Sequence, residues 1–188
     1  MSIRAVALML LAGIPATGHA GVTETSQRQL YEVRQAPGMS LLEALNRATP
    51  IREAGQPFHG YTDWRIHWNY RYRPRSDGLC GVSSVDVRLA VTMTLPDLKE
   101  STAEGAAQFA AYFPALVEHE DGHQRIGAAA ARDVEAAIAQ LPPAPSCPML
   151  EREIARAAND LVERARQNNK AYDAATRHGC TQGACLKR

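Results

Sequence analysis

Two segments of the chain alternate strictly between apolar and polar residues, which is typical of β-strands with one buried face. Residues 64–72 place Trp, Ile and Tyr side chains on one face and polar side chains on the other: Arg65, His67, Asn69 and Arg71. Residues 85–95 place an apolar side chain at every second position. The turn-rich sequence RPRSDGLCG joins the two segments, so together they predict an antiparallel β-hairpin. Pro96 is expected to end this sheet.

After the hairpin, apolar residues recur at helical spacing. Ser101 and Glu104 form a capping box that predicts a helix start. Pro114 is expected to break or kink that helix, or to supply the first turn of a second one. Further helices are predicted at residues 149–172 and, before Pro50, around Leu41, Leu42 and Leu45. The inward stripe of the long central helix is predicted to contain Leu116, His119, His123, Ile126, Ala130, Val134, Ala137 and Leu141.

Because strands come first and helices follow, the order of elements predicts the α+β class. We expect a small antiparallel sheet packed against the long central helix and a C-terminal helix. The whole of residues 21–188 is expected to form a single domain, since this length can bury a core of its own.

The first twenty residues have the features of a secretory signal peptide. A positive charge at Arg4 precedes an apolar run, and small residues follow up to Ala20, where cleavage is expected. The apolar run is too short for a membrane span. A buried N-terminal helix is the alternative. Without this segment the chain has 20 basic and 20 acidic residues, so no basic block predicts binding to nucleic acid or a membrane surface. We therefore expect an exported protein, periplasmic or secreted.

Four cysteines lie in the part of the chain that is expected to be exported. An even number of cysteines in an exported protein favours disulfides over free thiols. Three pairings are possible, and we favour Cys180–Cys185 as a short local loop with Cys80–Cys147 as the long-range link. A four-cysteine zinc site is the alternative, but the sequence has no C-x-x-C pair to support it.

The sequence HEDGH within the long predicted helix matches the zinc motif H-E-x-x-H. Residues four apart share one helix face, so His119 and His123 can direct their imidazoles to one metal ion. Glu120 is rotated by about 100° from His119 and can take a proton from a water that zinc has acidified to a pKa of about 7. The alternative is a pair of core or surface histidines with a solvated Glu120.

A catalytic zinc usually has three protein ligands and one open position. His178, just past the last predicted helix, is our candidate for the third ligand, or else it faces the helix C-terminus. Asp173 is the strongest carboxylate candidate, as a ligand or as a group that orients an imidazole. Tyr172 is a candidate to stabilise an oxyanion, or a core residue. Gly122 suggests a close approach to the helix backbone. We expect three further residues near the motif or on the hairpin to be solvated: Glu118, Asp121 and His67.

Several segments together resemble a bacterial family catalogued as domain of unknown function nine-two-two, whose members are described as predicted secreted zinc-dependent proteases. The segments are GYTDWRIHWNYRY, LPDL, HEDGH, YDAATRHG and TQGA. The resemblance spans about residues 31–184. It implies zinc at His119 and His123, Glu120 as the base and His178 as the third ligand. The cysteines around TQGA are not part of the family pattern.

These features predict an exported zinc-dependent hydrolase with a zincin-like fold, specifically a metalloprotease, that binds one zinc ion per chain. The expected substrate is a peptide or protein, with cell-wall peptide included, and the hairpin edge offers a strand on which it could pair. The main alternative is a non-catalytic binding or scaffold protein of the cell envelope with a structural zinc, held by four protein ligands. A metal-free, disulfide-bonded binding module is the third possibility. The sequence makes no prediction of oligomeric state.

Overall fold

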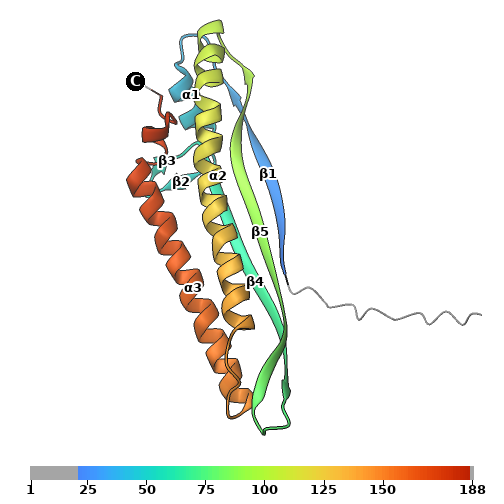
Figure 1. Ribbon diagram of the computed structural model, residues 1–188. Coiled ribbons are helices and arrows are strands. Elements are labelled where there is room, and N and C mark those ends of the chain that lie inside the picture. The colour runs from blue at the N-terminus through green and yellow to red at the C-terminus, as the bar shows by residue number, and fades with distance from the viewer. Residues whose placement is uncertain (1–20, 187–188) are drawn as a thin grey trace, which may run out of the picture.

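The computed structural model describes residues 21–186 of the chain and has a mixed α+β architecture: a small sheet and three helices (Figure 1). The expected signal peptide, residues 1–20, lies outside the described residues. The elements follow in the order β1 (Val22–Arg34), α1 (Leu41–Ala48), β2 (Arg52–Glu53), β3 (Gln56–Pro57), β4 (Tyr61–Pro74), β5 (Cys80–Glu100), α2 (Ala103–Ala139), α3 (Cys147–Thr176) and a 3₁₀ turn at Cys180–Gln182.

The main sheet has three strands in the order β1-β5-β4. Strands β4 and β5 pair antiparallel, with Trp64 opposite Val91, so the predicted hairpin is confirmed. Strand β1, which the sequence did not predict, pairs parallel with β5. The sheet is therefore mixed, and the expectation of a purely antiparallel sheet was wrong.

Strand β5 continues through Pro96 to Glu100, contrary to the expectation that the proline would end the sheet. The last residue of β5 with a partner on β4 is Thr94, which lies opposite Tyr61. Beyond Thr94 only β1 pairs with β5, where Tyr31 lies opposite Pro96. Pro96 therefore lies where β5 has a neighbour on one side only, and such an edge position tolerates a residue that has no N–H to donate.

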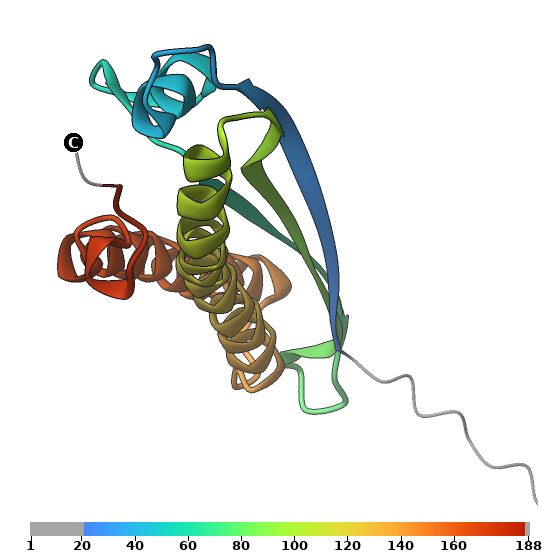
Figure 2. The ribbon, with the colours of Figure 1, turned by 90° about the horizontal axis from the view of Figure 1, so that it is seen from above.

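Helix α2 lies against one face of the sheet, and α3 lies alongside α2 (Figure 2). The apolar positions predicted from residues 85–95 are all buried and form the sheet side of the core. One apolar cluster surrounds the C-terminal half of α2, where Val134 and Ile138 meet Leu150 and Ile154 of α3. A second cluster surrounds its N-terminal half, where Tyr112 and Leu116 meet α1 and the top of the sheet.

Helix α2 is continuous over 37 residues, so the expected break at Pro114 does not occur. Proline at this position removes the helical hydrogen bond to the carbonyl of Ala110. Both residues are exposed, so water can hydrogen-bond this carbonyl. The helix is capped by Thr102, one residue after the predicted Ser101; the Thr102 hydroxyl accepts a hydrogen bond from the Gly105 N–H at 3.0 Å.

Helix α1 confirms the short helix predicted before Pro50, and Ser40 caps its N-terminus. Helix α3 begins two residues earlier and ends four residues later than predicted. This extension places Asp173 within the last turn of the helix. None of the helices in residues 21–186 has the length and apolar character needed to cross a membrane.

Both expected disulfides are present. Cys80–Cys147 joins the start of β5 to the start of α3, and Cys180–Cys185 closes a loop after α3. The favoured pairing is therefore confirmed, and a four-cysteine zinc site is excluded because all four thiols are used.

Candidate metal centre

Helix α2 turns both histidines of the HEDGH sequence toward α3. His119 and His123 are 4% and 5% exposed, respectively. Apolar residues before and after the histidines hold α2 against its neighbours. Leu116 belongs to the cluster around the N-terminal half of α2, and Val134 belongs to the cluster around its C-terminal half, with Ala130 also buried. The inward stripe predicted from the sequence therefore places two polar rings between two apolar clusters.

Asp173 on α3 completes a group of three potential metal ligands with the two histidines. The Nε2 atoms of His119 and His123 are 3.2 Å apart, and they lie 3.2 and 3.1 Å from Oδ1 of Asp173. Four ligands at zinc–ligand distances of about 2.0–2.1 Å in a tetrahedron would be separated by about 3.3–3.4 Å. The three donor atoms thus nearly match one face of a zinc tetrahedron, and the fourth position is left for another ligand.

The outer nitrogen of each imidazole is held by a side-chain amide. His119 Nδ1 lies 3.0 Å from Oε1 of Gln182, and His123 Nδ1 lies 2.9 Å from Oδ1 of Asn169. An amide oxygen can only accept, so each Nδ1 carries the proton and donates it. Each neutral ring then presents the lone pair of Nε2 to the centre. This is the tautomer that a metal ion requires from both rings.

Charge within the group also favours a bound cation. Burial raises the pKa of Asp173, but His119 and His123, whose Nε2 atoms donate to this carboxylate when the metal is absent and the rings carry a second proton, outweigh burial and leave the pKa below its ordinary value. Burial lowers the pKa of His123, but its bonds with Asp173 and Asn169 raise it more, so the net shift is upward. A carboxylate held ionised beside two imidazoles stabilises positive charge at this point. Two nitrogens and one oxygen form a donor set that zinc accepts.

Tyr172 packs directly against both histidines. Its ring stacks on His119 at a centroid distance of 5.1 Å and meets His123 edge-on at 5.0 Å. Its hydroxyl lies over Gly122, where a Cβ atom would be only 2.1 Å from the hydroxyl oxygen, so the close approach expected at this glycine is found. The hydroxyl accepts a hydrogen bond from Nε2 of Gln182 at 3.0 Å. These contacts give Tyr172 a positioning role; its expected role at an oxyanion remains a prediction.

Glu120 lies in a cavity of about 580 Å³ whose walls include His119, His123 and Asp173. The residue is 2% exposed, and its Oε2 accepts a hydrogen bond from the Thr62 hydroxyl at 2.7 Å. A Cβ atom at Gly60 would clash with this carboxylate, so the start of β4 is packed tightly against it. Burial raises the pKa of Glu120. The carboxylate therefore faces the cavity rather than solvent.

His178 lies beside the group of three ligands without belonging to it. Its Nδ1 is 3.4 Å from Oδ1 of Asp173, its side chain is 50% exposed, and its ring packs against Phe58. The sequence-based prediction that His178 is the third ligand therefore stays a prediction, while the geometry favours Asp173. Of the residues expected to be solvated, Glu118 pairs with Arg125 at the surface, His67 is exposed and Asp121 is partly buried.

Sequence reasoning missed the three side chains that hold the motif in place: Thr62, Asn169 and Gln182. Asn169 had a positional signal, since it lies four residues before Asp173 and thus on the same face of α3, and Gln182 lies within the family segment TQGA. Threonine, asparagine and glutamine are common on any protein surface, so their role becomes visible only when the elements are brought together.

Fold and site together define an α+β protein with a candidate metal centre between two helices. A family model described as "Bacterial protein of unknown function (DUF922)" matches residues 28–179, and the chain belongs to this family. The matched region contains all three candidate ligands, Glu120 and His178, and it ends before Gln182. Comparisons with curated proteins and with solved structures found no match.

Proposed function

We propose that this protein is an exported, zinc-dependent hydrolase that cleaves peptide bonds. The observation that carries the proposal is the triangle of His119 Nε2, His123 Nε2 and Asp173 Oδ1, with edges of 3.1–3.2 Å, in the wall of a cavity that also contains Glu120. Hydrolysis needs a base beside the metal ligands, and the buried Glu120 can serve as one, whereas a structural metal site requires none.

Each residue has a distinct role in this proposal. The two histidines and Asp173 hold the metal ion, and Asn169 and Gln182 keep the imidazoles in the ligating tautomer. Zinc at such a centre supplies a Lewis acid and lowers the pKa of a water that it binds to about 7. Glu120 accepts the proton from the attacking water and then donates it to the leaving amine. The Thr62 hydroxyl fixes the orientation of the Glu120 carboxylate.

The substrate class follows from the walls of the cavity. Tyr61 and Thr62, the first residues of β4, line it together with Gly60 just before the strand, and β4 is an edge strand of the main sheet. An extended peptide can pair with such an edge through its main chain and thereby bring a peptide bond toward Glu120. A peptide or protein is therefore the proposed substrate. Cell-wall peptides belong to the same class and would be accessible to an exported protein.

One observation favours a second function, that of a non-catalytic envelope protein with a structural metal. His178 lies 3.4 Å from Asp173, so a small movement of this exposed ring could supply a fourth protein ligand. A site with four protein ligands has no open position and cannot activate water.

The deciding experiment measures zinc content and peptide-library cleavage for the wild type, Glu120→Gln and the control Glu118→Gln. Glu118 lies on the same helix but is exposed and away from the cavity. We expect one zinc per chain in all three proteins, with cleavage by Glu120→Gln reduced by about 100-fold or more and cleavage by Glu118→Gln unchanged. Zinc without cleavage in the wild type would favour the structural site. A wild-type protein that binds no zinc would exclude both functions.

A further inference from the structure

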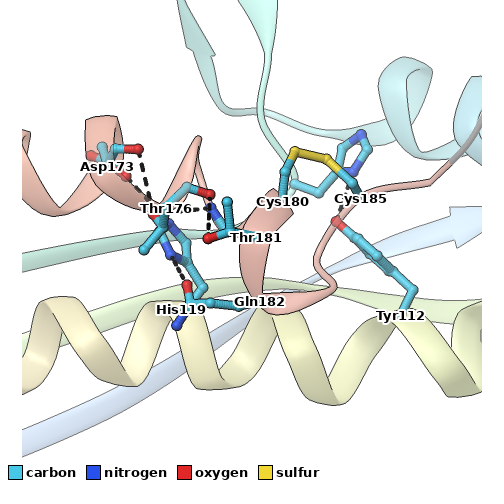
Figure 3. Close-up of a disulfide and its surroundings, with 10 residues drawn as sticks. Tyr112, His119, Asp173, Thr176, Cys180, Thr181, Gln182 and Cys185 are labelled. Atoms are coloured by element: carbon cyan, nitrogen blue, oxygen red, sulfur yellow. Dashed lines mark hydrogen bonds and ion pairs between the residues drawn. A yellow bond between two sulfur atoms is a disulfide. The ribbon is translucent and has the colours of Figure 1, made fainter.

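The loop after α3 reverses the chain so that it returns to α2. Three successive residues have left-handed backbone conformations: Arg177 (φ 51°), His178 (φ 52°) and Gly179 (φ 81°). A 3₁₀ turn follows at Cys180–Gln182, and the disulfide Cys180–Cys185 then closes the loop. In Figure 3 this loop lies between the end of α3 and the middle of α2, with Gln182 beside His119. We call residues 179–185 the C-terminal loop.

The C-terminal loop contacts the metal centre at two points. Gln182 accepts a hydrogen bond from His119 Nδ1 at 3.0 Å and donates one to the Tyr172 hydroxyl at 3.0 Å. Gly179 packs against the ring of the same histidine, where a Cβ atom would be 3.0 Å from its Cγ. The loop therefore holds His119 from behind, on the side opposite to the metal-binding nitrogen.

We propose that Gln182 is a positioning residue for the metal centre and that the Cys180–Cys185 disulfide holds it in place, so that metal affinity depends on this disulfide. The inference rests on the proposed function, because it concerns the same metal site. It goes beyond the matched region, because Gln182 and both cysteines follow the last residue that the family model matches, Gly179.

The physical reason is that a hydrogen bond to Nδ1 selects the tautomer and raises the basicity of the ligating Nε2. His123 receives this support from Asn169 within a long helix, whereas His119 receives it from a loop of a few residues. Without the disulfide, the C-terminal loop keeps local hydrogen bonds, such as Ala184 N–H to Gly179 O at 3.0 Å and the Thr181 hydroxyl to Thr176 O at 3.2 Å, together with the packing of the buried Ala184. The disulfide is the covalent constraint that is lost. More loop conformations then compete with the one that presents Gln182.

The dependence on the Cys180–Cys185 disulfide also makes the metal affinity of the centre sensitive to a reducing dithiol. A reduced dithiol would transfer two electrons and two protons to the bridge, becoming a disulfide itself while Cys180 and Cys185 become thiols. The chain remains intact, and the change at the metal centre is the loss of constraint on Gln182.

The test is zinc affinity, measured on the full mature chain by competition with a chromophoric chelator. Gln182→Met removes the acceptor at nearly constant volume, and we expect affinity to fall by about 10- to 100-fold. Gln182→Glu retains an acceptor and should keep at least wild-type affinity. The double variant Cys180→Ser/Cys185→Ser should lose roughly 10-fold. The matched control, Cys80→Ser/Cys147→Ser, lacks a disulfide far from the centre and should bind zinc as the wild type does at a temperature where it is folded.

A second measurement separates positioning from general destabilisation. Nitrogen NMR of the histidine side chains should show the Nδ1–H tautomer of His119 in the wild type and in Gln182→Glu, and a tautomer mixture in Gln182→Met. Unchanged zinc affinity in both Gln182→Met and Cys180→Ser/Cys185→Ser would overturn the inference and leave the proposed function standing. A wild-type protein without zinc affinity would instead overturn the proposed function, and this inference with it.

Discussion

At the scale of single residues, the candidate metal centre depends on which nitrogen of each imidazole is already hydrogen-bonded. The amide oxygens of Gln182 and Asn169 engage the outer nitrogens of the two imidazoles, and this leaves the Nε2 atoms free to meet Asp173. Two residues are then candidates for the third ligand. The geometry favours Asp173, whereas the sequence favoured His178. His178 Nδ1 lies only 3.4 Å from Asp173 Oδ1, so a comparison of zinc affinity between variants of the two residues can distinguish them.

We predict that Asp173→Ala weakens zinc binding by more than the roughly 10- to 100-fold loss typical of outer hydrogen-bond partners. The reason is that this change removes a donor atom from the triangle itself. His178→Ala should cost less than Asp173→Ala, because the ring is half exposed and lies outside the group. Chelator competition on both variants provides the measurement. A larger loss in His178→Ala would assign the third ligand to His178.

His59 carries the second prediction at this scale. Its Nε2 donates to Oδ1 of Asn46 at 2.8 Å, and its Nδ1 accepts from the Tyr112 hydroxyl at 2.9 Å. Burial lowers its pKa to about 4, while burial also raises the pKa of Tyr112 out of this range. The ring therefore stays neutral in the folded chain, whereas in the unfolded chain it gains a proton below its ordinary pKa of about 6.5.

This difference in proton binding determines how stability depends on pH. The unfolded state binds more protons between pH 6.5 and pH 4, so the free energy of unfolding falls as the pH falls through this window. Between about pH 7 and pH 4.5 we expect His59 to account for a loss of about 2–3 kcal/mol. Urea unfolding at both pH values measures it: His59→Gln should lack this part of the loss, and the exposed control His67→Gln should retain it. Equal losses in wild type and His59→Gln would contradict the prediction.

At the scale of elements, the sequence predicts those segments that are covered on one face only, because burial of one face produces a regular alternation of apolar and polar residues. Strand β5 alternates because α2 covers one of its faces. Strand β1 shows no such alternation: Glu24 and Arg28 lie opposite the buried Leu89 and Met93, yet both are exposed because little of α2 reaches β1. His119, Glu120 and His123 could be recognised because H-E-x-x-H is a local motif. The sequence also named Asp173 as a candidate, but it could not choose between Asp173 and His178, because the role of Asp173 depends on the packing of α3 against α2.

The packing of α2 against α3 depends on Gly122. A Cβ atom there would meet the hydroxyl and ring of Tyr172 at 2.1–2.7 Å, so in Gly122→Ala either the Tyr172 ring must move from its place beside the histidines or the two helices must separate. Overpacking of this kind costs about 1–3 kcal/mol, which outweighs the gain of about 0.8–1.0 kcal/mol in helix propensity. We predict lower stability and weaker zinc binding in this variant.

A double-mutant cycle with Tyr172→Ala checks the cause. In the Tyr172→Ala background the obstacle is gone, and Gly122→Ala should then be neutral or stabilising in urea unfolding. If Gly122→Ala is equally destabilising in both backgrounds, the contact with Tyr172 does not explain the glycine.

At the scale of the whole molecule, the candidate metal centre lies between two apolar clusters that pack around α2 on either side of it. The two disulfides lie in different parts of this arrangement. Cys80–Cys147 joins residues 67 apart and connects the sheet to the start of α3, whereas Cys180–Cys185 joins residues 5 apart and closes the loop at the centre. We therefore expect Cys80–Cys147 to constrain the fold and Cys180–Cys185 to constrain Gln182, which positions the candidate ligand His119.

This division predicts opposite rankings for stability and for metal binding. By loop-closure entropy, removing the long-range link costs about 4 kcal/mol of unfolding free energy and removing the short one about 2 kcal/mol. Urea unfolding of the two double Cys→Ser variants, without metal, should therefore show the larger loss for Cys80→Ser/Cys147→Ser, although only Cys180→Ser/Cys185→Ser should weaken zinc binding. If one variant lost more of both properties, stability and the centre would be a single cooperative unit, and the separation of the two disulfides by role would be wrong.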